Sequence, residues 1–456
     1  MLAEEAIHEI TRTNTNKDIN LMSSKRIVLS TFGSFGDLHP YMALALELQS
    51  RGHEPVIATM NYYREKVQNA GLSFAPVRPD FPQPKDQDPE LINRLLDPRK
   101  GIKFLTEEII FGSLRDSYAD LLSIVEGADL LVTHPAAPAG PLVGYKTGMG
   151  WVSSVLAPLS FFSAHDPPAP PFWHWTKKLR VLGPRAMRFF LDTTMSQYRA
   201  VAFNKFREEL GIPYYGNPTF EGQHSPTLIL AMFSPVFGPP QPDWPPQTKT
   251  TGFCFYDGHH EHSMSDAQIE FLNTGPAPII FTLGSTAVWV ARDFYAESIK
   301  AAQRLGQRAI LLIGDERNRP ADLPDGIIAA DYAPYQLLLP RGSAIVHSGG
   351  AGTTAQALLA GAPTLIVPFA FDQFDNADHA LRLGTSRTLY RNQYKAERVV
   401  RELEQLIGRP EYSQRARYIG ERLKQEDGPS TAADLIEQQL LRKETTTEEP
   451  AYASGD

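Results

Sequence analysis

The chain contains too few residues of several types to belong to certain classes of protein. Only one of its 456 residues is a cysteine, Cys254, which excludes an internal disulfide and a cysteine-rich metal cluster. A single thiol fits a reducing cytoplasm, which is the expected location. Basic residues are also few, because 44 Lys and Arg stand against 52 Asp and Glu, for a net charge of −8. Nucleic-acid binding needs clustered Lys and Arg, so no nucleic-acid partner is expected.

Long apolar runs are missing as well. No segment is apolar over the roughly 20 residues that a transmembrane helix requires. Residues 1–24 are polar and mixed in charge, unlike a signal peptide, and we expect a disordered extension there. The polar residues 443–456 are expected to form a disordered tail.

The remaining chain alternates between short β-rich runs and helical patterns. With 456 residues, 42% of them hydrophobic, it can build two cores. Alternation of this kind predicts parallel sheets with crossover helices, and hence two doubly wound α/β domains facing across a cleft. A helix is expected over 41–51, with Pro40 at its first position. The expected strands are 26–31, 55–59, 129–133, 152–156, 278–283, 309–313, 344–347 and 364–367.

A proline-rich stretch lies near the middle of the chain. Residues 237–246 contain five prolines, which cannot build a helix or a central strand. We therefore expect residues 237–247 to be the linker between the domains. The helices of 412–442 are expected to pack back on the first domain.

The strongest chemical signal is the segment His347-Ser-Gly-Gly-Ala-Gly-Thr-Thr354. It follows an expected strand and opens an expected helix, where free backbone N–H groups and the helix dipole suit a phosphate. His347 could donate to a phosphate oxygen. The alternative is an ordinary glycine-rich turn. The segment lacks the Gly-Lys-Ser/Thr of a P-loop and the spacing of G-x-G-x-x-G.

The region from Tyr332 through Gln373 resembles the donor-binding signature of family-1, GT-B-fold glycosyltransferases, in the branch of bacterial antibiotic and sterol enzymes. The loop from Gly33 to Pro40 resembles the first loop of the same branch. The resemblance implies an acceptor-binding domain over 25–236 and a nucleotide-sugar-binding domain over 248–411. It implies inverting transfer of a hexose from a UDP- or dTDP-sugar to a hydroxyl of a hydrophobic small molecule or lipid.

The resemblance also implies roles for residues of the second domain. One group would hold the nucleobase, a second the diphosphate and a third the sugar hydroxyls. Asp372 could alternatively cap the helix that follows it. Plant members carry Glu and Gln where this chain has Ala355 and Tyr335, so the donor's sugar and base stay open. The implied donor residues are Tyr332 and Ala333 at the base; Ser285, His347, Ser348, Gly350, Gly352 and Thr353 at the diphosphate; and Asp372 and Gln373 at the sugar.

For catalysis, the resemblance places the base at Asp37. A free Asp has a pKa near ~4 and is a weak base at neutral pH unless its site raises that value. Asp37 could instead cap the helix that begins there. His39 has a better matched intrinsic pKa, and it could be the base, a partner of Asp37 or a buried loop residue. His134 follows an expected strand and could face the cleft on the acceptor side, although a lone histidine is more often structural.

Aromatic residues gather on the expected acceptor side of the first domain. Trp151, Phe161, Phe172 and Trp173 could form the wall of a hydrophobic pocket, or they could be core packing. Lys177, Lys178 and Arg180 would permit peripheral contact with a membrane. The sequence does not indicate an oligomeric state.

No metal and no cofactor are expected. Asp86-x-Asp88 lies in a charged, proline-rich loop, and we interpret it as solvated. His259, His260 and His262 have no carboxylate at metal-site spacing. Three other functions stay open: a non-catalytic nucleotide-sugar-binding partner of a transferase, a GT-B sugar-nucleotide epimerase, and an NAD-dependent enzyme, which the missing fingerprint opposes.

Overall fold

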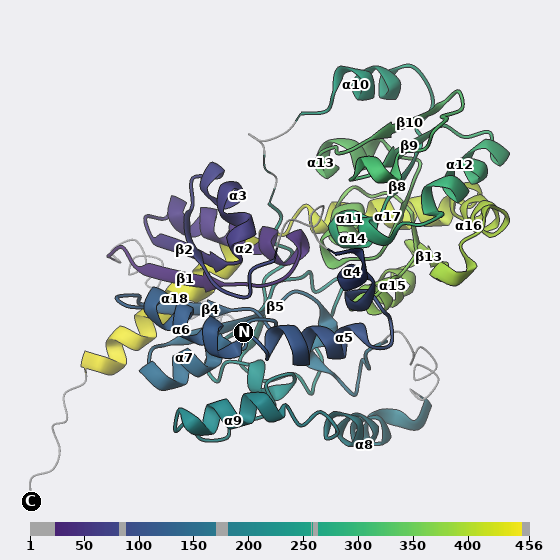
Figure 1. The fold of residues 1–456 in the computed structure, drawn as a ribbon. Coiled ribbons are helices and arrows are strands. Elements are labelled where there is room, and N and C mark those ends of the chain that lie inside the picture. Colours follow the sequence, from purple (N-terminus) through teal and green to yellow (C-terminus); the bar gives the residue numbers. More distant parts are fainter. Residues whose placement is uncertain (1–22, 82–87, 170–180, 257, 259–262, 449–456) are drawn as a thin grey trace, which may run out of the picture.

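A computed structural model describes residues 23–81, 88–169, 181–256, 258 and 263–448 of the chain. Two β-sheets, each flanked by helices, form two domains that lie side by side (Figure 1). The sheets have seven and six strands, and their pairings are parallel. The prediction of two doubly wound α/β domains is confirmed.

The first sheet has the order β3-β2-β1-β4-β5-β6-β7. Alternate residues of β1 point to opposite faces, so Ile27 and Leu29 join one apolar cluster and Val28 the other. The order reverses between β1 and β4, and ligands of such sheets bind at the carboxyl ends of the strands at this point. The strands are β1 (Arg26–Ser30), β2 (Glu54–Thr59), β3 (Ser73–Pro76), β4 (Leu130–Thr133), β5 (Trp151–Val155), β6 (Ile229–Ala231) and β7 (Thr248–Thr250).

The second sheet has the order β10-β9-β8-β11-β12-β13, and its order reverses between β8 and β11. Helices cover both faces, which explains why β8, β9 and β11 are buried over their whole length. The strands are β8 (Ile279–Thr282), β9 (Ala309–Leu312), β10 (Ile327–Ala330), β11 (Ala344–His347), β12 (Thr364–Ile366) and β13 (Ser386–Thr388).

The helices connect successive strands, as crossover connections require. Those of the first domain include α2 (Phe35–Ser50), α3 (Arg64–Asn69), α4 (Pro89–Leu95), α5 (Gly101–Lys103), α6 (Leu114–Ile124), α7 (Ala139–Thr147), α8 (Gly183–Met195) and α9 (Val201–Glu209). Those of the second include α10 (Asp266–Asn273), α11 (Gly284–Ala287), α12 (Phe294–Arg304), α13 (Tyr335–Leu338), α14 (Ala351–Leu359), α15 (Gln373–Arg382), α16 (Ala396–Gly408), α17 (Pro410–Leu423) and α18 (Gly428–Glu448).

Helix α2 begins earlier than expected. The prediction placed Pro40 at the first helical position, but the helix starts at Phe35 and Pro40 lies inside it. The reason is a capping box, in which Ser34 is the N-cap and Asp37 is the third helical residue. The box fixes the start of the helix, and the proline only removes one later hydrogen bond.

The proline-rich segment is not the linker between the domains, so the prediction for residues 237–247 is wrong. Strand β7 follows this segment and pairs with β6 in the first sheet, which keeps the segment within the first domain. Phe237 and Trp244 are buried in one apolar cluster with residues of both domains. The chain crosses to the second domain only after β7, on the way to α10 (Figure 1).

The last two helices take different positions. Helix α17 packs against α14 and α16 of the second domain, whereas α18 returns to pack against α2 of the first. The expectation that residues 412–442 pack on the first domain therefore describes α18 and not α17. Helix α18 also continues to Glu448, so residues 443–448 are helical and not part of a disordered tail as expected. Residues 449–456, and 1–22 of the expected extension, lie outside the described residues.

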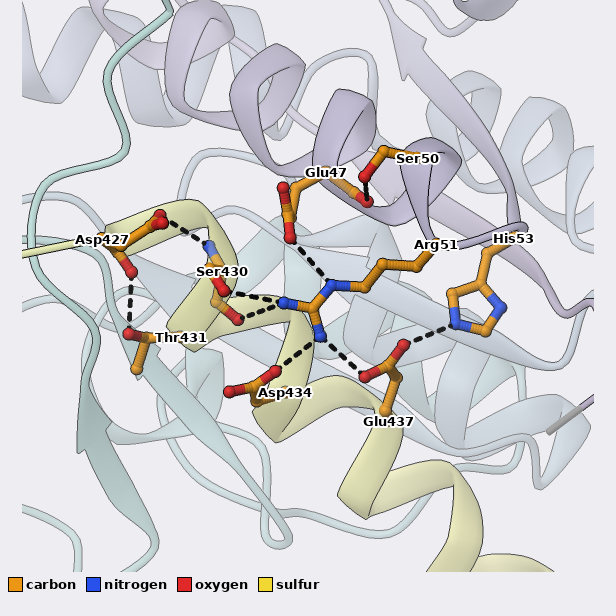
Figure 2. Close-up of polar contacts among 9 residues, drawn as sticks. All are labelled: Glu47, Ser50, Arg51, His53, Asp427, Ser430, Thr431, Asp434 and Glu437. Atoms are coloured by element: carbon orange, nitrogen blue, oxygen red, sulfur yellow. Dashed lines mark hydrogen bonds and ion pairs between the residues drawn. The ribbon is translucent and has the colours of Figure 1, made fainter. Parts of the chain in front are cut away.

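A charged cluster joins α18 to the end of α2 (Figure 2). Arg51 donates to Glu47 at 2.8 Å and to Glu437 at 2.8 Å, and it also bonds Asp434 and Ser430. His53 lies 3.1 Å from the second oxygen of Glu437, whose side chain is 3% exposed. Since α2 carries the loop of Asp37 at its other end, this cluster, called here the α2–α18 clasp, holds that helix in place.

Candidate active site

Asp37 lies at the carboxyl end of β1, in the first turn of α2. Its Oδ2 accepts hydrogen bonds from the backbone N–H of Ser34 at 2.7 Å and from the Ser34 hydroxyl at 3.1 Å. Only glycine fits at position 33 beside this carboxylate, because a Cβ on Gly33 would lie 2.3 Å from Oδ2 of Asp37. The alternative that Asp37 is the N-cap is not what the structure has, since Ser34 occupies that position.

His134 approaches Asp37 from the neighbouring strand, β4. Its Nε2 lies 3.5 Å from Oδ1 of Asp37. Its Nδ1 accepts the backbone N–H of Ala136 at 3.2 Å, so the hydrogen of the neutral ring is on Nε2, facing the carboxylate. Burial lowers the pKa of His134, against the charge of Asp37, which raises it. One oxygen of Asp37 is therefore held by Ser34 and the other faces a neutral N–H donor.

His39 lies elsewhere. Its ring packs between Phe35 at 5.2 Å and Tyr256 at 5.1 Å. Burial lowers the pKa of His39 to about 3, and the charge of Lys66 acts in the same direction. An imidazole with this pKa is a poor proton acceptor at neutral pH, and the ring of His39 is enclosed by aromatic side chains.

The glycine-rich segment lies at the switch point of the second sheet, which is the place between β8 and β11 where the strand order reverses. His347 ends β11, is fully buried, and accepts the N–H of Gly349 on Nδ1 at 3.1 Å. Burial lowers the pKa of His347 to about 3, so the ring is neutral and its hydrogen is on Nε2. Within the described part of the chain no group accepts that N–H. A buried donor without a partner is rare and indicates a place where a ligand supplies the acceptor.

Room for such a ligand lies beside α14. A Cβ built on Gly350, the N-cap of α14, would have none of the described heavy atoms within 4 Å. A Cβ on Gly352 would lie 3.7 Å from Cα of Gly36, in the first turn of α2. The start of α14 therefore faces the loop of Asp37. Ser348 is different from these residues, because its hydroxyl points inward and donates to the carbonyl of Leu283 at 2.9 Å.

Asp372 and Gln373 begin α15 beside the same segment. Asp372 is at the N-cap position, yet in the described chain its side chain makes no capping hydrogen bond. Instead Asn376 donates to Asp372 at 2.7 Å and to the carbonyl of Gly349 at 3.0 Å. Gln373 accepts two backbone N–H groups on Oε1, which leaves its amide NH₂ as the end that can meet a ligand.

The two domains are close enough here for their carboxylates to interact. Burial raises the pKa of Asp372 to about 7, and the charge of Asp37 acts in the same direction. Charges far apart are screened, so this effect agrees with the close approach of Gly352 to Gly36. Asp37 and Asp372 therefore belong to loops that face one another.

Three further residues expected to bind the donor lie in the second domain. Tyr332 is 57% exposed. Its carbonyl accepts from Gln268 at 2.9 Å, and Ala333 beside it is buried. Ser285 is exposed in the first turn of α11, after β8 and next to β11.

Of the four aromatic residues expected on the acceptor side, the structure describes Trp151 and Phe161. Trp151 is the first residue of β5, at the amino end of the strand and so opposite the end where ligands bind. Its indole packs against Gly144. Phe161 is stacked between Trp244 at 4.1 Å and His224 at 5.5 Å. It borders a cavity of about 1040 Å³ between α8 and α9, whose lining includes neither Asp37 nor Asp372. Phe172 and Trp173 lie outside the described residues, as do Lys177, Lys178 and Arg180.

Two expectations about metals concern other parts of the chain. Asp88 is the N-cap of α4 and accepts the N–H of Glu90 at 2.9 Å, which is a structural role. Asp86 and the histidines 259, 260 and 262 lie outside the described residues. In the part of the chain that the structure describes, no group of three or more His, Cys, Asp or Glu side chains could hold a metal ion. Nor does any helix there combine the length and hydropathy needed to cross a bilayer.

Sequence reasoning missed two residues of the site. Asn376 ties Asp372 to the glycine-rich segment, and its spacing of four from Asp372, which places both on one helix face, could have indicated it. Ser34 holds Asp37, and Ser34-x-x-Asp37 has the spacing of a capping box.

The fold and the site together define a class of protein: a GT-B transferase, with two parallel-sheet domains that face one another. Comparison with known proteins leads to the same class. The model of the glycosyltransferase family 28 N-terminal domain matches residues 27–111. The model of the erythromycin biosynthesis protein CIII-like C-terminal domain matches residues 298–438.

Relatives match nearly the whole chain. O-mycaminosyltylonolide 6-deoxyallosyltransferase of Streptomyces fradiae is 31% identical over 91% of this chain and 97% of its own length. Sterol 3-beta-glucosyltransferase of Emericella nidulans is 28% identical over 94% of this chain, which spans only 31% of that longer protein. The glycosyltransferase of kitacinnamycin has a similar structure, with a TM-score of 0.67 at 18% identity, covering 91% of this chain and 99% of the other. Glycosyltransferase VinC, solved in complex with DTDP, gives 0.65 at 19% identity, covering 91% and 100%.

The chain belongs to the glycosyltransferase family of the Streptomyces fradiae enzyme, and it is a nucleotide-sugar-dependent hexosyltransferase. The family resemblance drawn from the segments at Gly33 and His347 is thereby confirmed.

Proposed function

We propose that this transferase inverts the anomeric centre of its donor, with Asp37 as the general base and without a metal ion. The observation that carries the proposal is the placement of Asp37 opposite the start of α14. Gly352 approaches Gly36 to 3.7 Å, measured from a built Cβ, and the charge of Asp37 contributes to the raised pKa of Asp372. A sugar held by Asp372 and Gln373 would then lie next to Asp37.

In the proposed reaction an acceptor hydroxyl oxygen attacks the anomeric carbon as the bond from that carbon to the diphosphate breaks. The hydroxyl proton moves to Asp37. Negative charge grows on the departing diphosphate, where the Nε2–H of His347 and the free N–H groups at the start of α14 stabilise it. These fixed donors take the part that a metal ion has in other transferases. His134 holds Asp37 in position through its Nε2–H.

Asp372 and Gln373 are proposed to bind sugar hydroxyls, with Tyr332 stacked on the base. UDP- and dTDP-sugars are the candidate donors, and complexes with thymidine diphosphate among the structural neighbours support dTDP. The acceptor is proposed to be a hydrophobic molecule with a hydroxyl, because the relatives include a macrolide-type transferase and sterol glucosyltransferases. Such an acceptor would bring the protein to a membrane surface in some cases. The buried free thiol of Cys254 fits a cytoplasmic setting.

Product analysis tests the reaction. UDP-glucose and dTDP-glucose are each incubated with a hydroxylated macrolactone or a 3β-hydroxysterol, with and without EDTA. The expected product is a β-glucoside formed in amounts equal to the free nucleoside diphosphate, and unaffected by EDTA. An α-glucoside would contradict inversion, and loss of turnover in EDTA would contradict metal independence.

The variant Asp37→Asn separates a catalyst from a mere binding protein. Turnover should fall by about 10³-fold, within the range for loss of a general base, while the Kd for dTDP or UDP stays within twofold. Asp322→Asn, an exposed aspartate of the second domain, is the matched control and should keep full turnover. Unchanged turnover in Asp37→Asn would overturn the assignment of the base. Conversion of the donor without any acceptor would instead favour an epimerase.

A further inference from the structure

Helix α15 also contacts the first domain, through side chains from its first turn onward. The contact is with residues 163–169, which follow β5 on the side of the sheet where β4 ends and His134 lies. Ala169 donates its backbone N–H to Oδ1 of Asp375 at 2.9 Å, and this bond is buried. A loop of the first domain is therefore bonded directly to the helix that begins with Asp372.

His379, one turn further along α15, strengthens this contact. Its Nδ1 lies 2.9 Å from the carbonyl of Phe237, so that nitrogen carries a hydrogen. Its Nε2 lies 3.4 Å from Asp375 and 3.6 Å from Asp166, which belongs to the loop. Three points of the first domain, Asp166, Ala169 and Phe237, thus meet one face of α15.

Arg382 completes the network at the end of α15. It donates to Asp166 at 3.0 Å and lies 3.5 Å from Asp378. Asp375 and His379 are only 3% and 4% exposed. Burial alone would raise the pKa of Asp375, but bonds from His379 and Ala169 keep it below its ordinary value. The carboxylate is therefore charged and fully partnered inside the domain interface.

An interface made of apolar residues could be as stable as this one. Buried ion pairs rarely add net stability, and their best supported use is to fix one geometry among several. The first domain holds the same loop from behind, since Asp243 accepts from Ser163 at 2.6 Å and from Ala164 at 2.7 Å. The loop is thus fixed at one end to its own domain and at the other end to α15.

We infer that Asp375 and His379 are positioning residues, which set the acceptor-side loop 163–169 at a fixed place relative to the sugar. Residues 372, 375, 376 and 379 follow the spacing of one helix face, so the same rigid face bears the sugar-binding Asp372 and this interdomain network. The inference rests on the proposed function, because it requires that the loop borders the acceptor. It predicts that the network controls acceptor affinity, while donor affinity depends on Asp372 and Gln373 at the start of the helix.

The variant Asp375→Asn tests this division. The KM for the acceptor found in the product screen should rise about tenfold, kcat should change less than threefold, and the Kd for dTDP or UDP should stay within twofold. Glu297→Gln is the matched control, because Glu297 is also a buried carboxylate that accepts a buried backbone N–H, from Ala396 at 2.8 Å, but within the second domain. It should leave both constants unchanged. Equal changes in acceptor KM and donor Kd, or no change in either, would overturn the inference.

Hydrogen exchange supplies a readout that does not depend on turnover. The amide of Ala169 should exchange at least tenfold faster in Asp375→Asn, while dTDP or UDP still protects the amides of residues 350–353. If Asp375→Asn does not fold, Asp166→Asn removes the network from the loop side and should raise the acceptor KM in the same way. Absence of transfer by the unmodified chain would defeat the proposed function alone, whereas unchanged exchange at Ala169 would defeat this inference alone.

Discussion

The two switch points of this molecule are built in different ways. At the first, between β1 and β4, Asp37 is bonded by Ser34 through one oxygen and faced by His134 through the other. At the second, between β8 and β11, the described structure leaves the Nε2–H of His347 without an acceptor and the space beside Gly350 open. The first point holds one carboxylate in one orientation, whereas the second offers a buried N–H donor beside open space.

In the proposed function, this difference lets one site bind both the diphosphate of the donor and the hydroxyl of the acceptor. The diphosphate must be bound by many weak donors that accept its growing charge, and such donors work best when they are fixed before the ligand arrives. The base must instead touch a neutral hydroxyl in one geometry, which requires that its other contacts are already made. Substitutions at the two points should therefore have different kinetic signatures.

Beyond Asp37→Asn, the largest effect is expected at the second point, from His347→Ala. Loss of one fixed donor to a developing charge lowers kcat/KM by about 10²–10³-fold, and the Kd for dTDP should also rise, because His347 meets the diphosphate in both states. Steady-state kinetics and calorimetry measure the two values. A variant that keeps its dTDP affinity and turnover would show that the orphan N–H of His347 does not face the diphosphate.

A somewhat smaller effect is expected at the first point, from Gly33→Ala. The new Cβ would lie 2.3 Å from the Asp37 oxygen, and Gly33 has a φ of +139° that other residues rarely adopt. The carboxylate must move, and displacement of a reacting group by about 1 Å costs roughly 10²-fold in rate. We expect kcat to fall by that factor with dTDP affinity unchanged. Gly127 also has a positive φ, but a Cβ there would meet open space. Gly127→Ala is therefore the control for backbone strain alone.

A third effect, of about tenfold, is expected from pH. Asp372 accepts sugar hydroxyls best when ionised, and with a pKa of about 7 it is roughly one-tenth ionised at pH 6 and nine-tenths at pH 8. The Kd for the sugar nucleotide should therefore fall about tenfold between these values, while the Kd for the free nucleoside diphosphate changes less. Asp372→Asn should abolish the difference. A pH-independent ratio of the two affinities in the unmodified protein would contradict this role.

Ionisation of Asp372 also affects folding. Because the folded pKa lies above the unfolded value, its contribution to stability is fully present below pH 4 and is lost as the pH rises toward 7. The apo protein with Asp372→Asn should therefore melt a few degrees higher than the unmodified protein at pH 8, with no gain at pH 4. Thermal melts at the two pH values measure this.

The smallest effect on activity is expected in the α2–α18 clasp. Arg51→Ala leaves the buried Glu437 with His53 alone, and breaking a buried ion pair costs about 3 kcal/mol, or about 6 to 12 °C in Tm. The pKa of Glu437 is held below its ordinary value by His53 and Arg51 although burial opposes this, so the loss should shrink as the pH falls below about 4. Turnover at 20 °C should stay within twofold. Arg115→Ala, in an exposed pair with Glu209, should leave the Tm nearly unchanged.

Much of the fold could be predicted from the sequence, because buried parallel strands are continuous apolar runs. The strand expected at 344–347 is β11, and the others differ by one or two residues at their ends. Strand β7 could not be found in this way, since Thr248-Lys249-Thr250 is a polar edge strand without an apolar signal. Missing it led to the mistaken linker, because prolines exclude a strand but do not tell which elements lie on either side.

The site was predictable where a motif fixes a residue's place at a strand end. His347, Gly350, Gly352 and Asp37 all occur at the two switch points. The acceptor side was not predictable from aromatic content. Trp151 is the first residue of its strand, so it lies at the amino end and not at the carboxyl end where ligands bind. Only the three-dimensional packing shows that its indole covers Gly144. The contacts of His134 with Asp37 and of Asn376 with Gly349 were equally hidden, because they join separate segments.

The facing of the two switch points can be measured directly by cysteine cross-linking. A disulfide needs Cβ atoms about 3.5–4.5 Å apart, and a Cβ built on Gly352 would lie 3.7 Å from Cα of Gly36. The double variant Gly36→Cys with Gly352→Cys should form the bond under mild oxidation and lose turnover until it is reduced. Gly36→Cys with Gly408→Cys, at the far end of α16, should form none. If the first pair stayed reduced while turnover was normal, the two loops would not share one cleft and the account would be wrong.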